Sequence, residues 1–147
     1  MTTRPSDMPP EIGPHEGREL EMMLAGEKPL AMFSDVVPPS FDWDEDQFQL
    51  YVDQGRLLKH EQTLQYSTPS KHQQRFVYFA LPNERWRIDR MSEINQHLSD
   101  VAHATNQQIE AEIGQLLGYS EREIDVYITR FFSKQWRRKF TGKSPLL

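Results

Sequence analysis

The stretch Arg75-Phe76-Val77-Tyr78-Phe79-Ala80-Leu81 decides the fold of this chain. Its centre, Phe76 to Phe79, is aromatic and β-branched, a composition that favours a β-strand. The polar residues 67–74 precede it and contain a proline, which predicts a hairpin loop. Residues 57–66, on the other side of that loop, therefore predict the second strand of a hairpin.

A third strand and two short helices are predicted ahead of this hairpin. Residues 30–37 are mostly apolar and are closed by two prolines, which predicts a strand. Residues 14–25 predict a helix that opens at a proline, carries apolar residues at helical spacing and stops at Gly26. A second helix is expected to run to Asp53 from a cap in the acidic loop 40–46.

The C-terminal half has a helical pattern. From Met91 to Leu116 apolar residues recur three or four positions apart, although the polar residues 103–106 weaken the pattern and leave a break there open. Ser120 and Glu123 have the spacing of a capping box and predict the start of a last helix. The expected fold class is α+β, with a small, mostly antiparallel three-stranded sheet packed with about four helices and a long helical C-terminal half.

The 147 residues suffice for one domain. We expect a flexible leader over residues 1–13, a single α+β domain over 14–141 and a short tail over 142–147. There is no cysteine, which excludes disulfides, thiol nucleophiles and Cys-ligated metals. No apolar run approaches the ~18–20 residues that span a bilayer, and the first ten residues lack the apolar core of a secretory signal. We therefore expect a cytoplasmic protein that makes no membrane contact.

Charge is sorted along the chain. Residues 1–55 hold twelve acids and three bases, a net of −9, whereas residues 130–147 hold six bases and no acid. The segment between them holds ten acids and eight bases. This acidic N-terminal region and basic C-terminal segment indicate a charged partner, or one end of a chain docking on the other.

No motif predicts catalysis, a cofactor or a metal. Acidic residues within 42–53 match several ligand positions of a calcium loop, but Gln47 stands where the sharp turn needs glycine. No two of the five histidines form an HxxxH pair, and the pair His15 and Glu19, four positions apart, would need a further ligand to hold a metal. The histidines are therefore predicted to be surface or capping groups. No glycine-rich phosphate loop and no nucleophile motif is present. We therefore name no catalytic residue, no metal ligand and no cofactor.

Two segments place aromatic residues among bases and are the candidate partner-binding sites. The first contains Trp86 and Arg87, a pair that suits a protein hot spot or stacking on a base. The alternative is that Trp86 anchors the junction between the strand and the following helix. The second segment lies near the C-terminus of the chain. Its bases could contact phosphates, or its aromatic residues could form a buried helical face with the cations placed at the helix C-terminus. Its candidate residues are Lys134, Trp136, Arg137, Arg138 and Lys139.

These patterns favour a non-catalytic protein that binds a macromolecule, such as a small regulator, adaptor or inhibitor. A protein partner is expected first, because twelve acids in the first 55 residues would repel a polyanion. The alternative is a regulator that binds nucleic acid through the basic aromatic C-terminal helix. An enzyme of unrecognised class is the third interpretation. A homodimer is also open, since oppositely charged ends allow reciprocal pairing.

Overall fold

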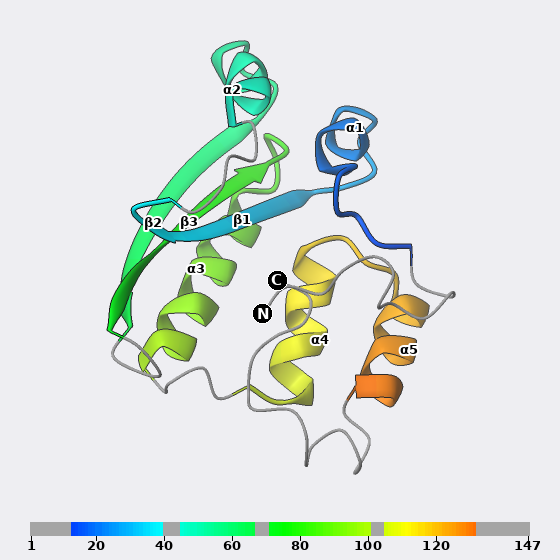
Figure 1. The fold of residues 1–147 in the computed structure, drawn as a ribbon. Helices are drawn as coiled ribbons and strands as arrows, with labels where there is room; N and C mark the ends of the chain where they lie inside the picture. The colour runs from blue at the N-terminus through cyan, green and yellow to red at the C-terminus, as the bar shows by residue number, and fades with distance from the viewer. Residues whose placement is uncertain (1–12, 40–44, 67–70, 101–104, 132–147) are drawn as a thin grey trace.

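The computed structural model describes residues 13–39, 45–66, 71–100 and 105–131. In this part of the chain a three-stranded antiparallel sheet lies between helices, with α1 and α2 on one side and α3 and α4 on the other (Figure 1). The predicted α+β class and the three-stranded sheet are therefore confirmed. The elements in chain order are α1 (Glu19–Leu24), β1 (Leu30–Val37), α2 (Glu45–Asp53), β2 (Leu58–Tyr66), β3 (His72–Ala80), α3 (Arg85–Asp100), α4 (Gln107–Leu116) and α5 (Glu121–Phe131).

The strand quoted above is the centre of the sheet. The strand order is β1-β3-β2, and Ala80 at the end of β3 is paired with Leu30 on one side and Leu58 on the other. All five residues from Phe76 to Ala80 are buried. A strand that is covered on both faces carries a continuous apolar run, which explains why this stretch lacks the alternation of a half-buried strand.

Side chains of β3 point alternately into two separate cores. Val77 and Phe79 face α1 and α2, where they pack with Met23, Ala31, Phe48 and Leu57. Phe76, Tyr78 and Ala80 face α3 and α4. This larger core also contains Leu30, Leu64, Tyr66, Ile88, Met91, Ile94, Leu98, Ile113, Leu116 and Leu117. Each buried Val, Leu, Ile, Phe or Met side chain among them contributes about 1.5–3 kcal/mol by leaving water.

The larger core contains one polar network. The buried Tyr78 hydroxyl donates to Gln62 Oε1 at 2.5 Å and accepts from Asn95 Nδ2 at 2.8 Å. Gln62 Nε2 in turn donates to the carbonyl oxygen of Ser92 at 3.1 Å. Burial raises the pKa of Tyr78 to about 12, so the hydroxyl stays neutral and can donate. The network fixes the position of α3 along β2 and β3, because these directional bonds hold only in one register.

The helical half begins earlier than predicted, and it is divided where the sequence pattern left a break open. First, α3 begins at Arg85, six residues before the predicted start at Met91. Its first turn is set by the fully buried Ile88, which the sequence pattern did not include in the apolar stripe. Second, α3 ends at Asp100, and a separate helix α4 starts after Asn106, whose side chain accepts from the Ile109 N–H at 2.9 Å. The described residues thus form five helices rather than about four.

Two element starts were also misplaced. α1 begins at Glu19 rather than Pro14, because Gly17 takes a left-handed conformation with φ of +82° that a helix cannot continue. β3 begins at His72, inside the predicted hairpin loop, because His72 pairs with Tyr66 at the end of β2. The ladder between β2 and β3 therefore extends closer to the loop than propensity alone indicated.

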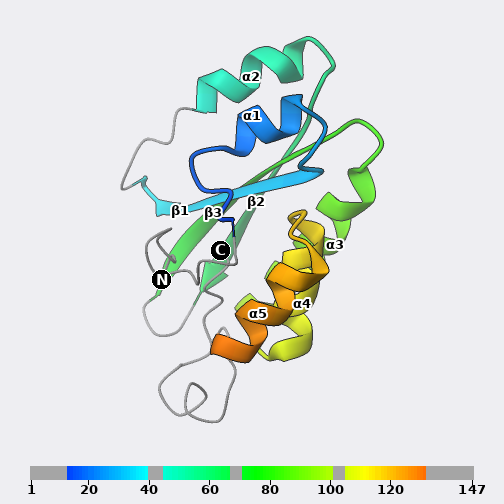
Figure 2. The same ribbon diagram turned by 90° about the vertical axis from the view of Figure 1, so that its right-hand side faces the viewer.

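α4 and α5 lie side by side and are joined by the predicted turn (Figure 2). Gly118 ends α4 with φ of +92°. The capping box is confirmed, since the Glu123 N–H donates to Ser120 Oγ at 3.1 Å and the Ser120 N–H donates to Glu123 Oε1 at 2.9 Å. A Cβ on Gly118 would lie 2.7 Å from Cδ of Pro29, so this turn packs directly against the residue before β1.

We expect Gly118→Ala to destabilise the protein more than Gly55→Ala. Gly55 has φ of +74° with open space around it, so alanine there adds only left-handed strain of about 1 kcal/mol. Gly118 adds a steric overlap with Pro29, and the expected loss is about 2–3 kcal/mol. Urea unfolding of the two variants measures the difference. Equal losses would show that the turn does not pack against Pro29.

Candidate functional site

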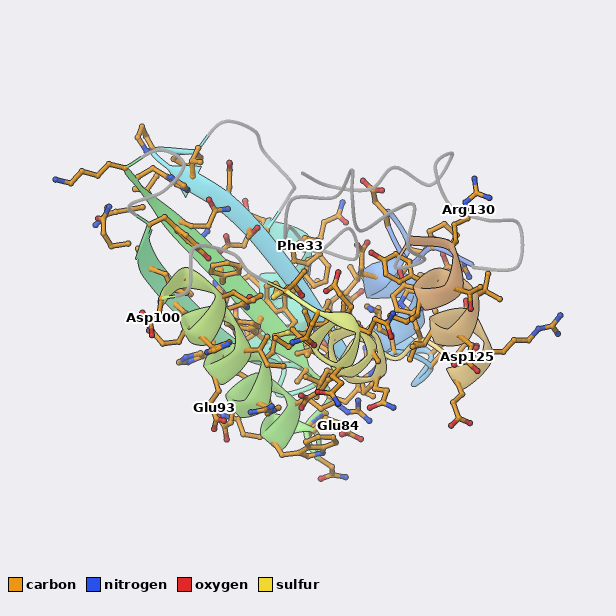
Figure 3. All side chains as sticks on the ribbon, turned by 90° about the horizontal axis from the view of Figure 1, so that it is seen from below. Phe33, Glu84, Glu93, Asp100, Asp125 and Arg130 are labelled. Atoms are coloured by element: carbon orange, nitrogen blue, oxygen red, sulfur yellow. The ribbon has the colours of Figure 1, made fainter. Side chains whose placement is uncertain are left out.

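Trp86 lies in the first turn of α3 and its side chain is 55% exposed. The chain turns tightly out of β3, where the Glu84 N–H donates to the Leu81 carbonyl oxygen at 2.9 Å. Two residues after Trp86, the buried Ile88 holds α3 against the sheet, which directs Trp86 towards solvent. Glu84 lies at this end of α3 and Asp100 at the other (Figure 3). Trp86 therefore does not anchor the junction by burial, which was the alternative interpretation.

The exposed indole is nevertheless held in place. Its Nε1 donates to Glu84 Oε2 at 2.9 Å. The same carboxylate oxygen accepts from Arg87 Nε at 2.8 Å, and the guanidinium carbon of Arg87 lies 4.6 Å from the centre of the indole ring. A cation over the ring face and an acceptor at the ring edge fix the orientation of Trp86. A partner that covers the ring therefore pays little additional side-chain entropy.

Arg87 also connects the start of α3 to the end of α4. Its Nη1 donates to the carbonyl oxygens of Gln115 at 2.8 Å and Leu116 at 3.1 Å. These are among the last carbonyls of α4, where a cation is favoured by the helix dipole. Because one guanidinium serves the ring, the Glu84 carboxylate and two carbonyls, Trp86 is positioned by the packing of α3 against α4.

The neighbouring arginines are neutralised by acids. Arg85 lies 3.6 Å from Asp89, and Arg90 donates to Glu112 Oε1 of α4 at 2.8 Å. The hydrogen bond from Arg90 holds the pKa of Glu112 below its ordinary value, so this pair stays charged. The basic residues around Trp86 thus form a charge-balanced surface rather than a cationic patch.

Of the two predicted segments, the first lies within the described residues. Trp86 and Arg87 are in direct contact, as the sequence suggested. The candidate residues of the second segment lie outside the described residues. They are Lys134, Trp136, Arg137, Arg138 and Lys139.

Sequence reasoning missed one cluster and misjudged one of its members. Lys28 and His15 are both buried and lie in contact beneath the turn between α4 and α5. The prediction that His15 is a surface or capping group is wrong, because Tyr119 covers its ring. The sequence carried no local signal for this, since Tyr119 is 104 positions from His15.

Comparison with known protein families, with curated proteins and with solved structures finds no match. Within the described ranges, no helix has both the length and the apolar character needed to cross a membrane. The same residues contain no group of three or more His, Asp or Glu side chains placed to hold a metal ion.

We expect Arg87→Lys to destabilise the protein by about 1–3 kcal/mol. Arg87 contacts Glu84 through Nε and the two carbonyls through Nη1, and the single ammonium nitrogen of lysine cannot occupy both positions. Arg85→Lys on the same helix is the matched control. Arg85 is exposed and has one exposed ion pair, so its loss should stay below about 0.5 kcal/mol. Urea unfolding compares the two variants. Similar values would mean that Arg87 does not connect α3 to α4.

Proposed function

We propose that this chain is a non-catalytic binding protein that docks a partner protein on the surface around Trp86. The observation that carries the proposal is an exposed indole that is already held by Glu84 and Arg87. Tryptophan and arginine are the residues most enriched among interface hot spots. A small regulator, adaptor or inhibitor needs such a preorganised contact more than it needs a cleft.

The charge around Trp86 supports a protein rather than a nucleic acid as the occupant. Each arginine near Trp86 that the structure describes faces an acid, so these arginines are less available for phosphate contacts than unpaired cations would be. We also propose a cytoplasmic location, because the chain contains no cysteine and so shows no sign of an oxidising compartment. A second copy of the chain is one form that the partner protein could take.

We expect Trp86→Ala to weaken binding of the partner about 30-fold or more, which corresponds to the 2 kcal/mol of a hot spot. The wild-type protein is first used to capture the partner from an extract of the cells that naturally produce this chain. The partner is then purified and titrated against each variant. Sedimentation of the wild-type protein alone tests self-association.

Leu50→Ala is the matched control, because Leu50 is also 55% exposed but lies on α2, on the other side of the sheet. This variant should bind within about threefold of the wild type. Both variants should unfold at nearly the wild-type urea concentration, since both side chains are mainly in solvent. A partner that binds Trp86→Ala as tightly as the wild type would disprove the docking site.

The second candidate function, nucleic-acid binding, is favoured by the six bases and the interleaved aromatics of residues 130–147. The test replaces Arg137, Arg138 and Lys139 by glutamine. A nucleic-acid binder should lose affinity for every sequence, and its salt slope should fall by roughly one unit per lost phosphate contact. We expect the wild type itself to cause no shift of DNA or RNA at low salt, because of its acidic N-terminal region. A clear shift would favour the nucleic-acid function.

A further inference from the structure

Residues Gly13–His15, here termed the strap, lie across the turn between α4 and α5. The Gly13 N–H donates to Glu123 Oε2 at 2.9 Å, and the His15 N–H donates to the Tyr119 hydroxyl at 3.1 Å. The His15 ring is stacked on the Tyr119 ring, with 3.9 Å between centres and 3° between planes. The strap therefore joins the start of the described chain to residues more than a hundred positions away.

An almost completely buried lysine lies under the strap. The Lys28 side chain belongs to a residue that is 2% exposed, and its Nζ lies 2.7 Å from Nδ1 of His15 and 2.6 Å from the Leu117 carbonyl oxygen. The Tyr119 ring covers it, with its centre 5.7 Å from Nζ. Among the described residues no carboxylate forms an ion pair with Lys28, and Glu19 of α1 acts on it only from longer range. An ammonium in this position is therefore poorly compensated.

Burial is the largest cause of the pKa shift of both groups, and it lowers both values. Burial lowers the pKa of Lys28 to about 7, against the opposing effect of Glu19. Burial, followed by Lys28 and Arg18, lowers the pKa of His15 to about 4, against the opposing effect of Glu123. Tyr119 is the third titratable group of the cluster. Burial raises its pKa, with smaller contributions from the acids Glu123, Glu19 and Glu16. Two cations 2.7 Å apart would repel, so the closed arrangement excludes the state in which Lys28 and His15 are both protonated.

We propose that the strap is a proton-controlled latch, which holds the turn between α4 and α5 over Lys28 in weakly basic solution and opens as the pH falls. The geometry carries this proposal, since the strap closes over a buried amine that lacks an anionic partner among the described residues. It is independent of the docking proposal, because no partner takes part.

The direction follows from proton binding. In the open state Lys28 returns to a pKa of roughly 10.4, so between pH 7 and that value the open state binds one more proton than the closed state. Each fall of one pH unit in this range raises the ratio of open to closed molecules roughly tenfold. His15 acts in the same direction at lower pH, because its pKa is about 4 when closed and roughly 6.5 when open.

Hydrogen exchange of the full-length protein tests the latch. After correction for intrinsic exchange rates, protection of the Gly13 and His15 amides should fall roughly tenfold from pH 8.5 to pH 7.5. Amides of α2, whose opening does not expose Lys28, should keep constant protection. Protection of the strap that is independent of pH, or that equals protection of β3 at every pH, would overturn the proposal.

Lys28→Met removes the titrating amine and should abolish the pH dependence of the strap, whatever its absolute protection. Lys59→Met is the matched control, because Lys59 is paired with Glu45 at 2.7 Å on the α2 face of the sheet. It should leave the pH dependence of the strap unchanged. If Lys28→Met does not fold, the side-chain carbon resonances of Lys28 in the wild type give the answer. Titration near neutrality supports the latch, and an amine that stays protonated to pH 10 refutes it.

Discussion

The whole fold depends on the burial of β3 on both faces. Its last five residues pair with β1 and β2 at the edges and contact helices above and below, so they set the register of the sheet and divide the core in two. A shift of one residue would exchange the two faces and move Tyr78 out of reach of Asn95. The polar network around Tyr78 therefore specifies the arrangement that the apolar contacts stabilise.

This constraint explains which parts of the fold were predictable from the sequence. The strands follow from local composition, because residues 76–79 are aromatic and β-branched and the prolines after residue 37 close β1. The capping box at Ser120 was equally visible, since its two partners are three positions apart. The start of α3 could not be predicted in this way, because residues 85–90 are mostly polar in sequence. The burial of Ile88 against the sheet, which is a tertiary contact, places that turn in the helix.

The functional geometry was predictable only in part, for the same reason. The Trp86–Arg87 pair could be named because its members are adjacent. The orientation of the indole could not, because Arg87 is held by carbonyls of α4 that lie 28 and 29 positions from it. The Lys28 cluster could not be named at all. A lysine between Glu27 and Pro29 resembles any surface lysine until the strap and the α4–α5 turn are brought over it.

The residues around Trp86 and the residues around Lys28 both contact the C-terminal end of α4. Arg87 donates to the carbonyl oxygen of Leu116, and Lys28 donates to that of the next residue, Leu117. Two basic side chains thus donate to adjacent carbonyls at the end of one helix, Arg87 from beside Trp86 and Lys28 from beneath the strap. Arg87 also contacts the indole of Trp86, so the end of α4 lies between the surface around Trp86 and the buried Lys28.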